Sequence, residues 1–167
     1  MTNKTNKIAR IGIISAIYCI LTLALGSISY GPIQFRISEI LMFLPLLSKD
    51  YIISLTLGCF LANLIGPYGV PDIIFGTLAT LISCILVYIT PSIFGKGKYT
   101  LLIASIWPTI INALIIGWML YKFVGLPFII SSLEVALGEF VVITIIGLPI
   151  FKIVNNRYGS IIKNLNN

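Results

Sequence analysis

The chain has 167 residues, of which 58% are hydrophobic and only 10% are charged, and its formal net charge is +6. A soluble domain usually carries about 25% charged residues, so this composition cannot cover a water-facing surface. The positive charge does not indicate nucleic-acid binding, because the basic residues lie in the tails and short loops, where membrane proteins concentrate them. The sequence therefore predicts an all-α integral membrane protein that forms a single domain over residues 1–167.

Apolar segments in chain order predict about six transmembrane helices. Crossing a hydrocarbon core of roughly 30 Å takes about 20 helical residues, and the second and third segments are short for that. We expect these two to tilt or to leave room for a loop that dips inward. The first segment is expected to be an uncleaved helix rather than a signal peptide. The predicted helices cover residues 8–27, 36–48, 51–66, 72–94, 100–122 and 130–154.

The connector at residues 26–35 is expected to be such an inward loop. It contains two glycines and a proline, which break helices, yet it also carries aromatic and aliphatic side chains that are unusual in a solvated turn. Irregular backbone is tolerated at membrane depth only where it faces protein or a water-filled cavity. The loop is therefore predicted to cap a cavity.

The basic residues predict the orientation, with both termini in the cytoplasm. This placement leaves only Arg36 and Lys122 outside, which agrees with the rule that positive charges stay inside. The nine basic residues on the inside are Lys4, Lys7, Arg10, Lys49, Lys96, Lys98, Lys152, Arg157 and Lys163.

The acidic residues show the opposite distribution, since only Asp50 lies on the inside. An ionised carboxylate near the membrane centre costs on the order of 3 kcal/mol, so several of them need a shared polar cavity. We expect that cavity to open outward. The four acids in the outer half of the predicted helices are Glu39, Asp72, Glu134 and Glu139.

Arg36 and Glu39 are three residues apart, so on a helix they share a face. The simpler interpretation is an ion pair at the start of the second helix. The alternative is that Arg36 holds the inward loop while Glu39 faces the cavity. The sequence leaves both open.

Further candidates lie deeper in the predicted helices. Glu139 is about ten residues into the sixth helix, roughly 15 Å along it, where a carboxylate is expected to contact a ligand. Glu134 lies about 140° from Glu139 around the axis of that helix, so the two glutamates are not expected to face the cavity equally. Asn63 and Asn112 can each bond a neighbouring helix or a ligand.

Two sets of small residues predict close helix packing. Ser54, Gly58, Ala62 and Gly66 repeat every four residues on the third helix, which is typical of a seam within the fold. Gly12 and Ala16 form a second pair on the first helix.

Catalytic chemistry has little support in this sequence. There is no histidine and no CxxC pair, so neither a metal site nor a disulfide framework is expected, and we predict no cofactor. Residues 95–100 lack the spacing of a phosphate loop, and no HExxH motif or nucleophile elbow is present. We do not expect an enzyme, and any ATP hydrolysis would have to come from a partner.

Several motifs together resemble the QueT family. Residues 28–39 read ISYGPIQFRISE and resemble its first-loop signature. The same holds for GCFLAN at 58–63, DIIFGTLAT at 72–80, Pro108 with Asn112, and ALGE at 136–139.

The resemblance implies a substrate-binding S component of an energy-coupling factor (ECF) transporter for queuosine precursors, in a prokaryotic plasma membrane. It implies a six-helix fold, a site capped by the first loop, and a module of two ATPases and a membrane coupling subunit. Family members dock that subunit through an Ala-x-x-x-Ala pair on the first helix. Gly12 and Ala16 take that place here, with glycine in place of the first alanine.

The implied ligand is a 7-deazaguanine, in the aminomethyl or cyano form, or queuine. Its N–H donors match a carboxylate, and its carbonyl suits Asn, Gln or Arg. The flat ring system would stack on Tyr30 or Phe35. The predicted site residues are Tyr30, Gln34, Phe35, Arg36, Glu39, Asn63, Asp72, Asn112 and Glu139.

Three alternatives remain. An S component for another vitamin such as riboflavin would share the fold and differ in its ligand. A stand-alone secondary transporter would ordinarily be larger and show inverted repeats. A small membrane enzyme would need a catalytic constellation that the sequence does not show.

Overall fold

The computed structural model describes residues 3–31, 33–95, 97 and 99–166, and within these ranges the side chains from residue 4 to residue 157. The described residues form helices joined by short connections, and they contain no β-strand. Pro32 of the predicted inward loop and the predicted inside residues Lys96 and Lys98 lie outside the described residues, as does the side chain of Lys163.

The structure divides the chain into α-helices and three helices of other types. The element η1 is a 3₁₀ helix, whereas η2 and η3 are π-helices that continue α5 and α6. The elements are α1 (Asn3–Ala24), α2 (Gly26–Ser29), η1 (Ile37–Leu46), α3 (Asp50–Ile65), α4 (Val70–Phe94), α5 (Thr100–Met119), η2 (Leu120–Val124), α6 (Phe128–Glu139), η3 (Phe140–Gly147) and α7 (Leu148–Asn166).

Four helical segments of the described chain are long and apolar enough to cross a membrane: Lys4–Ala24, Val70–Phe94, Thr100–Val124 and Phe128–Arg157. They correspond to the predicted first, fourth, fifth and sixth helices. The other two are shorter, since the 16 residues of α3 and the 10 residues of η1 extend about 24 Å and about 20 Å. That α3 and η1 also cross the membrane stays a prediction.

The predicted α-helix at 36–48 is wrong in type and in length. This segment forms η1, which contains Pro45. Proline has no N–H to donate, and in an α-helix its ring would clash with the carbonyl four residues earlier. At three residues per turn, Glu39, Met42 and Pro45 instead share one face, and all three are buried.

Other boundaries also differ from the prediction. The first helix extends over 3–24 rather than 8–27, and the separate single turn α2 follows it. The predicted helix at 130–154 begins at Phe128, directly after the extended backbone of Pro127, and is interrupted by η3. Short π segments are often found at functional sites. This one begins immediately after Glu139.

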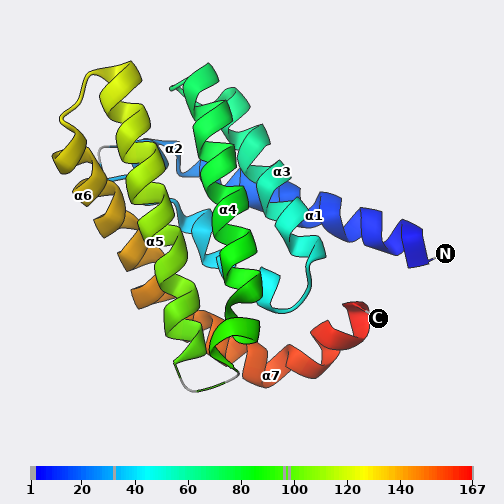
Figure 1. Ribbon diagram of the computed structural model, residues 1–167. Helices are drawn as coiled ribbons and strands as arrows, with labels where there is room; N and C mark the ends of the chain where they lie inside the picture. Colours follow the sequence, from blue (N-terminus) through cyan, green and yellow to red (C-terminus); the bar gives the residue numbers. More distant parts are fainter. Residues whose placement is uncertain (1–2, 32, 96, 98, 167) are drawn as a thin grey trace.

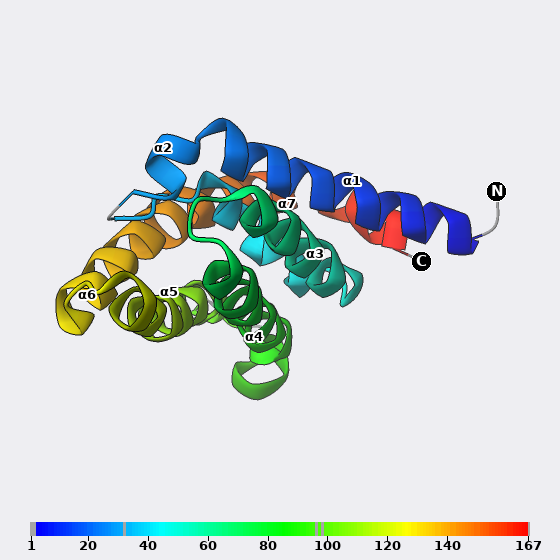
Figure 2. The ribbon, with the colours of Figure 1, turned by 90° about the horizontal axis from the view of Figure 1, so that it is seen from above.

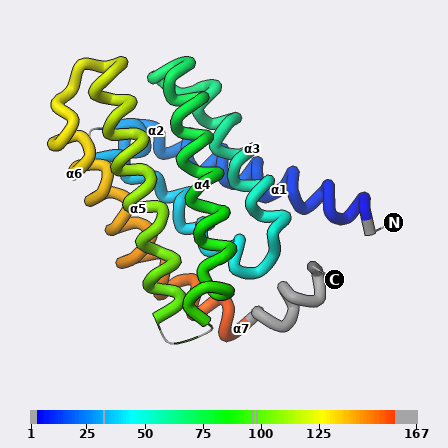
Figure 3. Tube along the Cα trace, in the orientation of Figure 1, coloured from blue at the N-terminus to red at the C-terminus, as the bar shows by residue number. Residues whose placement is uncertain are grey.

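The long helices pack in chain order, with α1 against α3, α3 against α4, α4 against α5 and α5 against α6. Figure 1 shows α3, α4 and α5 side by side, with the α3–α4 connection at the upper end. The Cα trace shows that α1 runs obliquely to them (Figure 3). The view from above places η1 inside this arrangement (Figure 2), and η1 packs against α1, α3, α4, α5, α7 and η3.

The apolar core surrounds η1 and brings α1 and α3 close together. Tyr18 of α1 packs there with Met42 and Phe43 of η1 and with Leu55 of α3. A Cβ atom at Gly58 would lie 2.8 Å from both the Ser15 carbonyl oxygen and the Tyr18 Cβ. The predicted small-residue seam on the third helix is therefore confirmed at Gly58 as a contact within the fold.

Candidate functional site

A buried ion pair joins the first loop to the start of α4. The Arg36 Nη2 atom lies 3.2 Å from Asp72 Oδ2, and the two side chains are 4% and 0% exposed. Asp72 occupies the first turn of α4, where the helix dipole favours a negative charge. Arg36 precedes η1 with extended backbone, so its guanidinium pairs with Asp72 and not with Glu39. The simpler sequence interpretation, an Arg36–Glu39 ion pair, is therefore wrong.

Tyr30 and Asn63 lie beside this ion pair. The Arg36 guanidinium carbon is 5.4 Å from the centre of the Tyr30 ring. The Tyr30 hydroxyl donates to the Ala62 carbonyl at 2.9 Å, and the Asn63 Nδ2 donates to the backbone carbonyl of Asp72 at 3.0 Å. The first loop, α3 and α4 are thus held together by polar contacts.

A second polar contact joins α5 to α6. The Asn112 Nδ2 donates to Glu139 Oε1 at 2.8 Å, and both residues are buried. Glu139 also interacts electrostatically with Glu39 and Arg36, which connects the two groups. Glu134 is only half-buried, which agrees with the predicted difference between the two glutamates of this helix.

Glu39 on η1 is held from α1. It is 1% exposed, and its Oε1 atom accepts a hydrogen bond from the hydroxyl of Tyr18. Beside it, the Thr22 and Ser38 hydroxyl oxygens are 2.6 Å apart. Tyr18 is absent from the site residues predicted above. The sequence contains a signal, because Ser15, Tyr18 and Thr22 recur at i, i+3 and i+7 in the otherwise apolar segment 11–24.

The loop carrying Gln34 rests directly on α6. A Cβ atom at Gly138 would collide with the Ile33 carbonyl oxygen and come within 3.0 Å of the Gln34 carbonyl oxygen. Gln34 itself is buried and has a φ of +26°, a conformation that residues other than glycine rarely adopt. Such backbone persists where its surroundings enforce it, commonly at binding sites. The ring of Phe35 packs against the apolar core around η1.

Five of the predicted site residues carry a buried polar atom without a hydrogen-bond partner among the described residues. Buried polar groups are nearly always paired, and each unpaired one costs about 1–3 kcal/mol. The cluster also holds three buried carboxylates but one buried guanidinium. It is therefore equipped to receive a ligand with N–H donors and positive charge. The five atoms are Gln34 Nε2, Arg36 Nε, Glu39 Oε2, Asn63 Oδ1 and Glu139 Oε2.

Gly12 and Ala16 lie away from this cluster, on the exposed side of α1. A Cβ atom at Gly12 would meet nothing within 4 Å in the described part of the chain. The pair is therefore accessible to another helix.

The chain matches the family model described as QueT transporter over residues 8–156. It is also 48% identical over 82 residues to the queuosine precursor transporter QueT of Lactococcus lactis subsp. cremoris (strain MG1363). That alignment covers 48% of this chain and 48% of the relative, about half the length of each. No solved structure matches the chain. With its four membrane-length helices, the match identifies a multi-pass protein of a prokaryotic cell membrane.

Proposed function

The chain belongs to the QueT transporter family, and we propose that it is the high-affinity S component of an ECF importer for a queuosine precursor. In this proposal residues 1–167 form one domain of six spans with both termini in the cytoplasm. Two ATPase subunits and a membrane coupling subunit supply the energy. The observation that carries the proposal is the pair Glu39 and Glu139, each with one carboxylate oxygen unpartnered among the described residues.

The ligand chemistry complements these atoms. Adjacent N–H donors of a deazaguanine match one carboxylate, and its carbonyl can accept from Gln34 Nε2 or Arg36 Nε. An aminomethyl group would place a cation against the second carboxylate. Because carboxylates outnumber cations here, we expect the aminomethyl form to bind more tightly than the neutral cyano form. Tyr30 and Phe35 are the aromatic residues proposed to stack on the ring.

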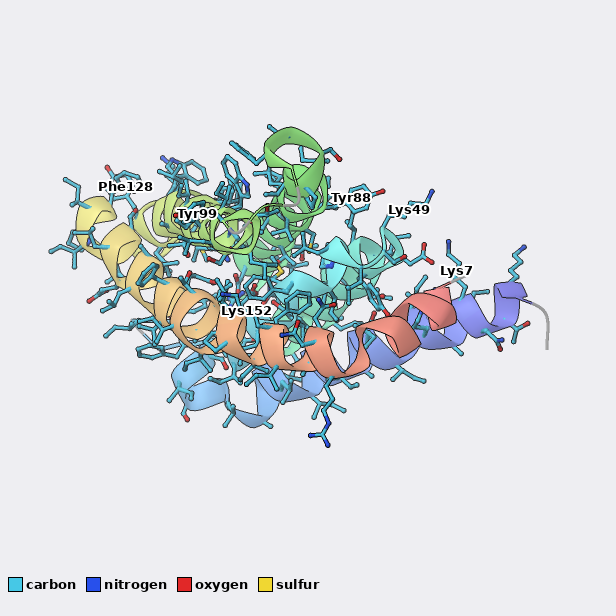
Figure 4. The ribbon with its side chains drawn as sticks, turned by 90° about the horizontal axis from the view of Figure 1, so that it is seen from below. Lys7, Lys49, Tyr88, Tyr99, Phe128 and Lys152 are labelled. Atoms are coloured by element: carbon cyan, nitrogen blue, oxygen red, sulfur yellow. The ribbon has the colours of Figure 1, made fainter. Side chains whose placement is uncertain are left out.

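The distribution of basic residues supports the proposed orientation. Figure 4, seen from below, labels Lys7, Lys49 and Lys152 around α1, α3 and α7. Lys7 pairs with Asp50 at the start of α3, whereas Asp72 lies at the opposite end of the α3–α4 pair, where α4 begins after its connection with α3 (Figure 1). Positive charges favour the cytoplasmic side, so the site is proposed to open to the outside.

Isothermal titration calorimetry of the purified protein in detergent tests the ligand class. We expect the 7-aminomethyl-7-deazaguanine to bind, and riboflavin, thiamine and biotin not to bind. Tight binding of one of those vitamins, together with no binding of any deazaguanine, would reject the proposal.

Docking to the coupling subunit is proposed to use Gly12 and Ala16, because small residues let another helix approach closely. The double variant Gly12→Leu with Ala16→Leu should no longer co-purify with the coupling subunit and ATPases, yet should still bind the ligand. Ala24→Leu is a control, since it adds the same bulk as Ala16→Leu at another exposed position of α1. Intact assembly with lost ligand binding would instead assign the pair to the protein's own core.

A further inference from the structure

We propose that Tyr18 is a positioning residue of the binding site, which holds the Glu39 carboxylate so that its second oxygen faces the ligand. This inference rests on the proposed function, since it concerns how the site receives its ligand. The Tyr18 hydroxyl donates to Glu39 Oε1, whereas Glu39 Oε2 has no hydrogen-bond partner in the described part of the chain. One oxygen is therefore fixed while the other is available.

No ion pair holds Glu39 within the described part of the chain. The buried cation of the cluster, Arg36, directs its Nη2 atom to Asp72 instead. The Ser38 hydroxyl lies 2.6 Å from the hydroxyl of Thr22. A glutamate side chain has three rotatable bonds, and binding is tighter when these are ordered before the ligand arrives.

Tyr18 is itself a rigid support. Its side chain is 0% exposed and packs in the apolar core with Met42, Phe43 and Leu55. The backbone of α3 at Gly58 passes so close that a Cβ there would lie 2.8 Å from the Tyr18 Cβ. The phenol ring is therefore confined on all of these sides, and its hydroxyl has a defined position at Glu39.

The geometry also connects the ligand site to the helix proposed for docking. Tyr18 lies on α1, with Gly12 and Ala16 about 120° and about 160° round the same helix. Glu39 is thus held by α1, although it belongs to η1.

The test is Tyr18→Phe, which removes the hydroxyl and keeps the ring in the core. We expect the dissociation constant for 7-aminomethyl-7-deazaguanine to rise about 10-fold or more, since a bond to a charged group is lost. Thr22→Val is the matched control, because it also removes a buried hydroxyl from the same face of α1. The Thr22 hydroxyl bonds Ser38 and not the Glu39 carboxylate. The control should stay within about twofold of wild type.

A double-mutant cycle separates positioning from a general structural role. If Tyr18 acts through Glu39, the variant Tyr18→Phe with Glu39→Gln should bind no more weakly than Glu39→Gln alone. Thermal unfolding of the ligand-free Tyr18→Phe protein should remain close to wild type, because the ring packing is retained.

Three results would overturn the inference while leaving the proposed function intact, provided that wild type binds the ligand. They are an unchanged affinity of Tyr18→Phe, full additivity with Glu39→Gln, and a loss of ligand-free stability large enough to account for the weaker binding. Failure of the wild-type protein to bind any deazaguanine would instead overturn the proposed function, and the inference with it.

Discussion

Two groups of charged side chains differ in how completely they are paired: a lower group around Asp50, at the start of α3, and an upper cluster that extends to Asp72, at the start of α4 (Figure 1). In the lower group, the two Asp50 oxygens lie 2.7 Å from Lys7 Nζ and 3.2 Å from Arg10 Nη2. In the upper cluster, Glu39 and Glu139 each have an oxygen without a hydrogen-bond partner among the described residues. Cations outnumber carboxylates in the first group, whereas carboxylates outnumber cations in the second.

The difference separates a structural contact from the site that we propose for the ligand. The lower group joins α1 to the start of α3, and the Arg10 guanidinium carbon also lies 5.9 Å from the centre of the Tyr51 ring. Its carboxylate needs nothing further. The upper carboxylates are almost fully buried, where an incomplete set of partners is costly unless a ligand completes it.

The largest effect is expected from Arg36→Met, which leaves Asp72 buried without its cation. Breaking a buried ion pair in this way typically costs about 3–5 kcal/mol of stability. Thermal unfolding in detergent measures the loss. The double variant Arg36→Met with Asp72→Asn should recover part of it, and equal unfolding temperatures for the two variants would contradict this role of the pair.

Glu139→Gln should weaken ligand binding by about 2–4 kcal/mol, because it removes a buried charge facing ligand donors. Calorimetry with the aminomethyl deazaguanine gives this value directly. Glu134→Gln on the same helix and Asp50→Asn in the lower group are the controls, and neither should change the affinity. An unchanged affinity for Glu139→Gln would remove this carboxylate from the proposed site.

The smallest effect is expected from Asp50→Asn, at about 0.2–1 kcal/mol of stability, since the Lys7 partner is 45% exposed and solvent screens the pair. The hydrogen bond from Lys7 lowers the pKa of Asp50, and the charges of Lys7 and Arg10 act in the same direction. A carboxyl with a lowered pKa stabilises the fold above its unfolded-state pKa and loses that contribution as pH falls through its folded-state pKa.

The wild-type protein should therefore lose this increment of stability on acidification, and Asp50→Asn should not. Unfolding temperatures measured from neutral to acidic pH compare the two. Lys49→Gln is the control, because it removes a nearby charge that forms no ion pair in the described part of the chain. Parallel pH profiles for wild type and Asp50→Asn would contradict the assignment.

Much of the upper cluster could be predicted from the sequence. Carboxylates and amides are rare in apolar segments, so Glu39, Asp72, Asn112 and Glu139 are conspicuous there. Tyr18 was not predicted, because tyrosine is also common in membrane helices as an interfacial anchor. Its hydrogen bond to Glu39 depends on how α1 packs against η1.

The sequence pattern also could not predict that the second helix is a 3₁₀ helix and not an α-helix. An apolar run such as residues 37–46 is compatible with an α-helix, and a single internal proline can kink a helix rather than change its type. The 3₁₀ geometry depends on neighbours, since η1 packs against six other elements inside the bundle. It places Glu39 against Tyr18 and leaves Arg36 free to reach Asp72.

The sequence by itself determined that the protein resides in a membrane, which family it resembles, and which polar residues lie in its apolar segments. These follow from composition and local order, because the cost of placing a charge in lipid depends on the residue and its segment. Tertiary structure alone decided the pairings: Arg36 with Asp72, Tyr18 with Glu39 and Asn112 with Glu139. In each pair the two residues are between 21 and 36 positions apart in the chain. Hydrogen bonds act over about 3 Å, so these partners depend on how the helices pack.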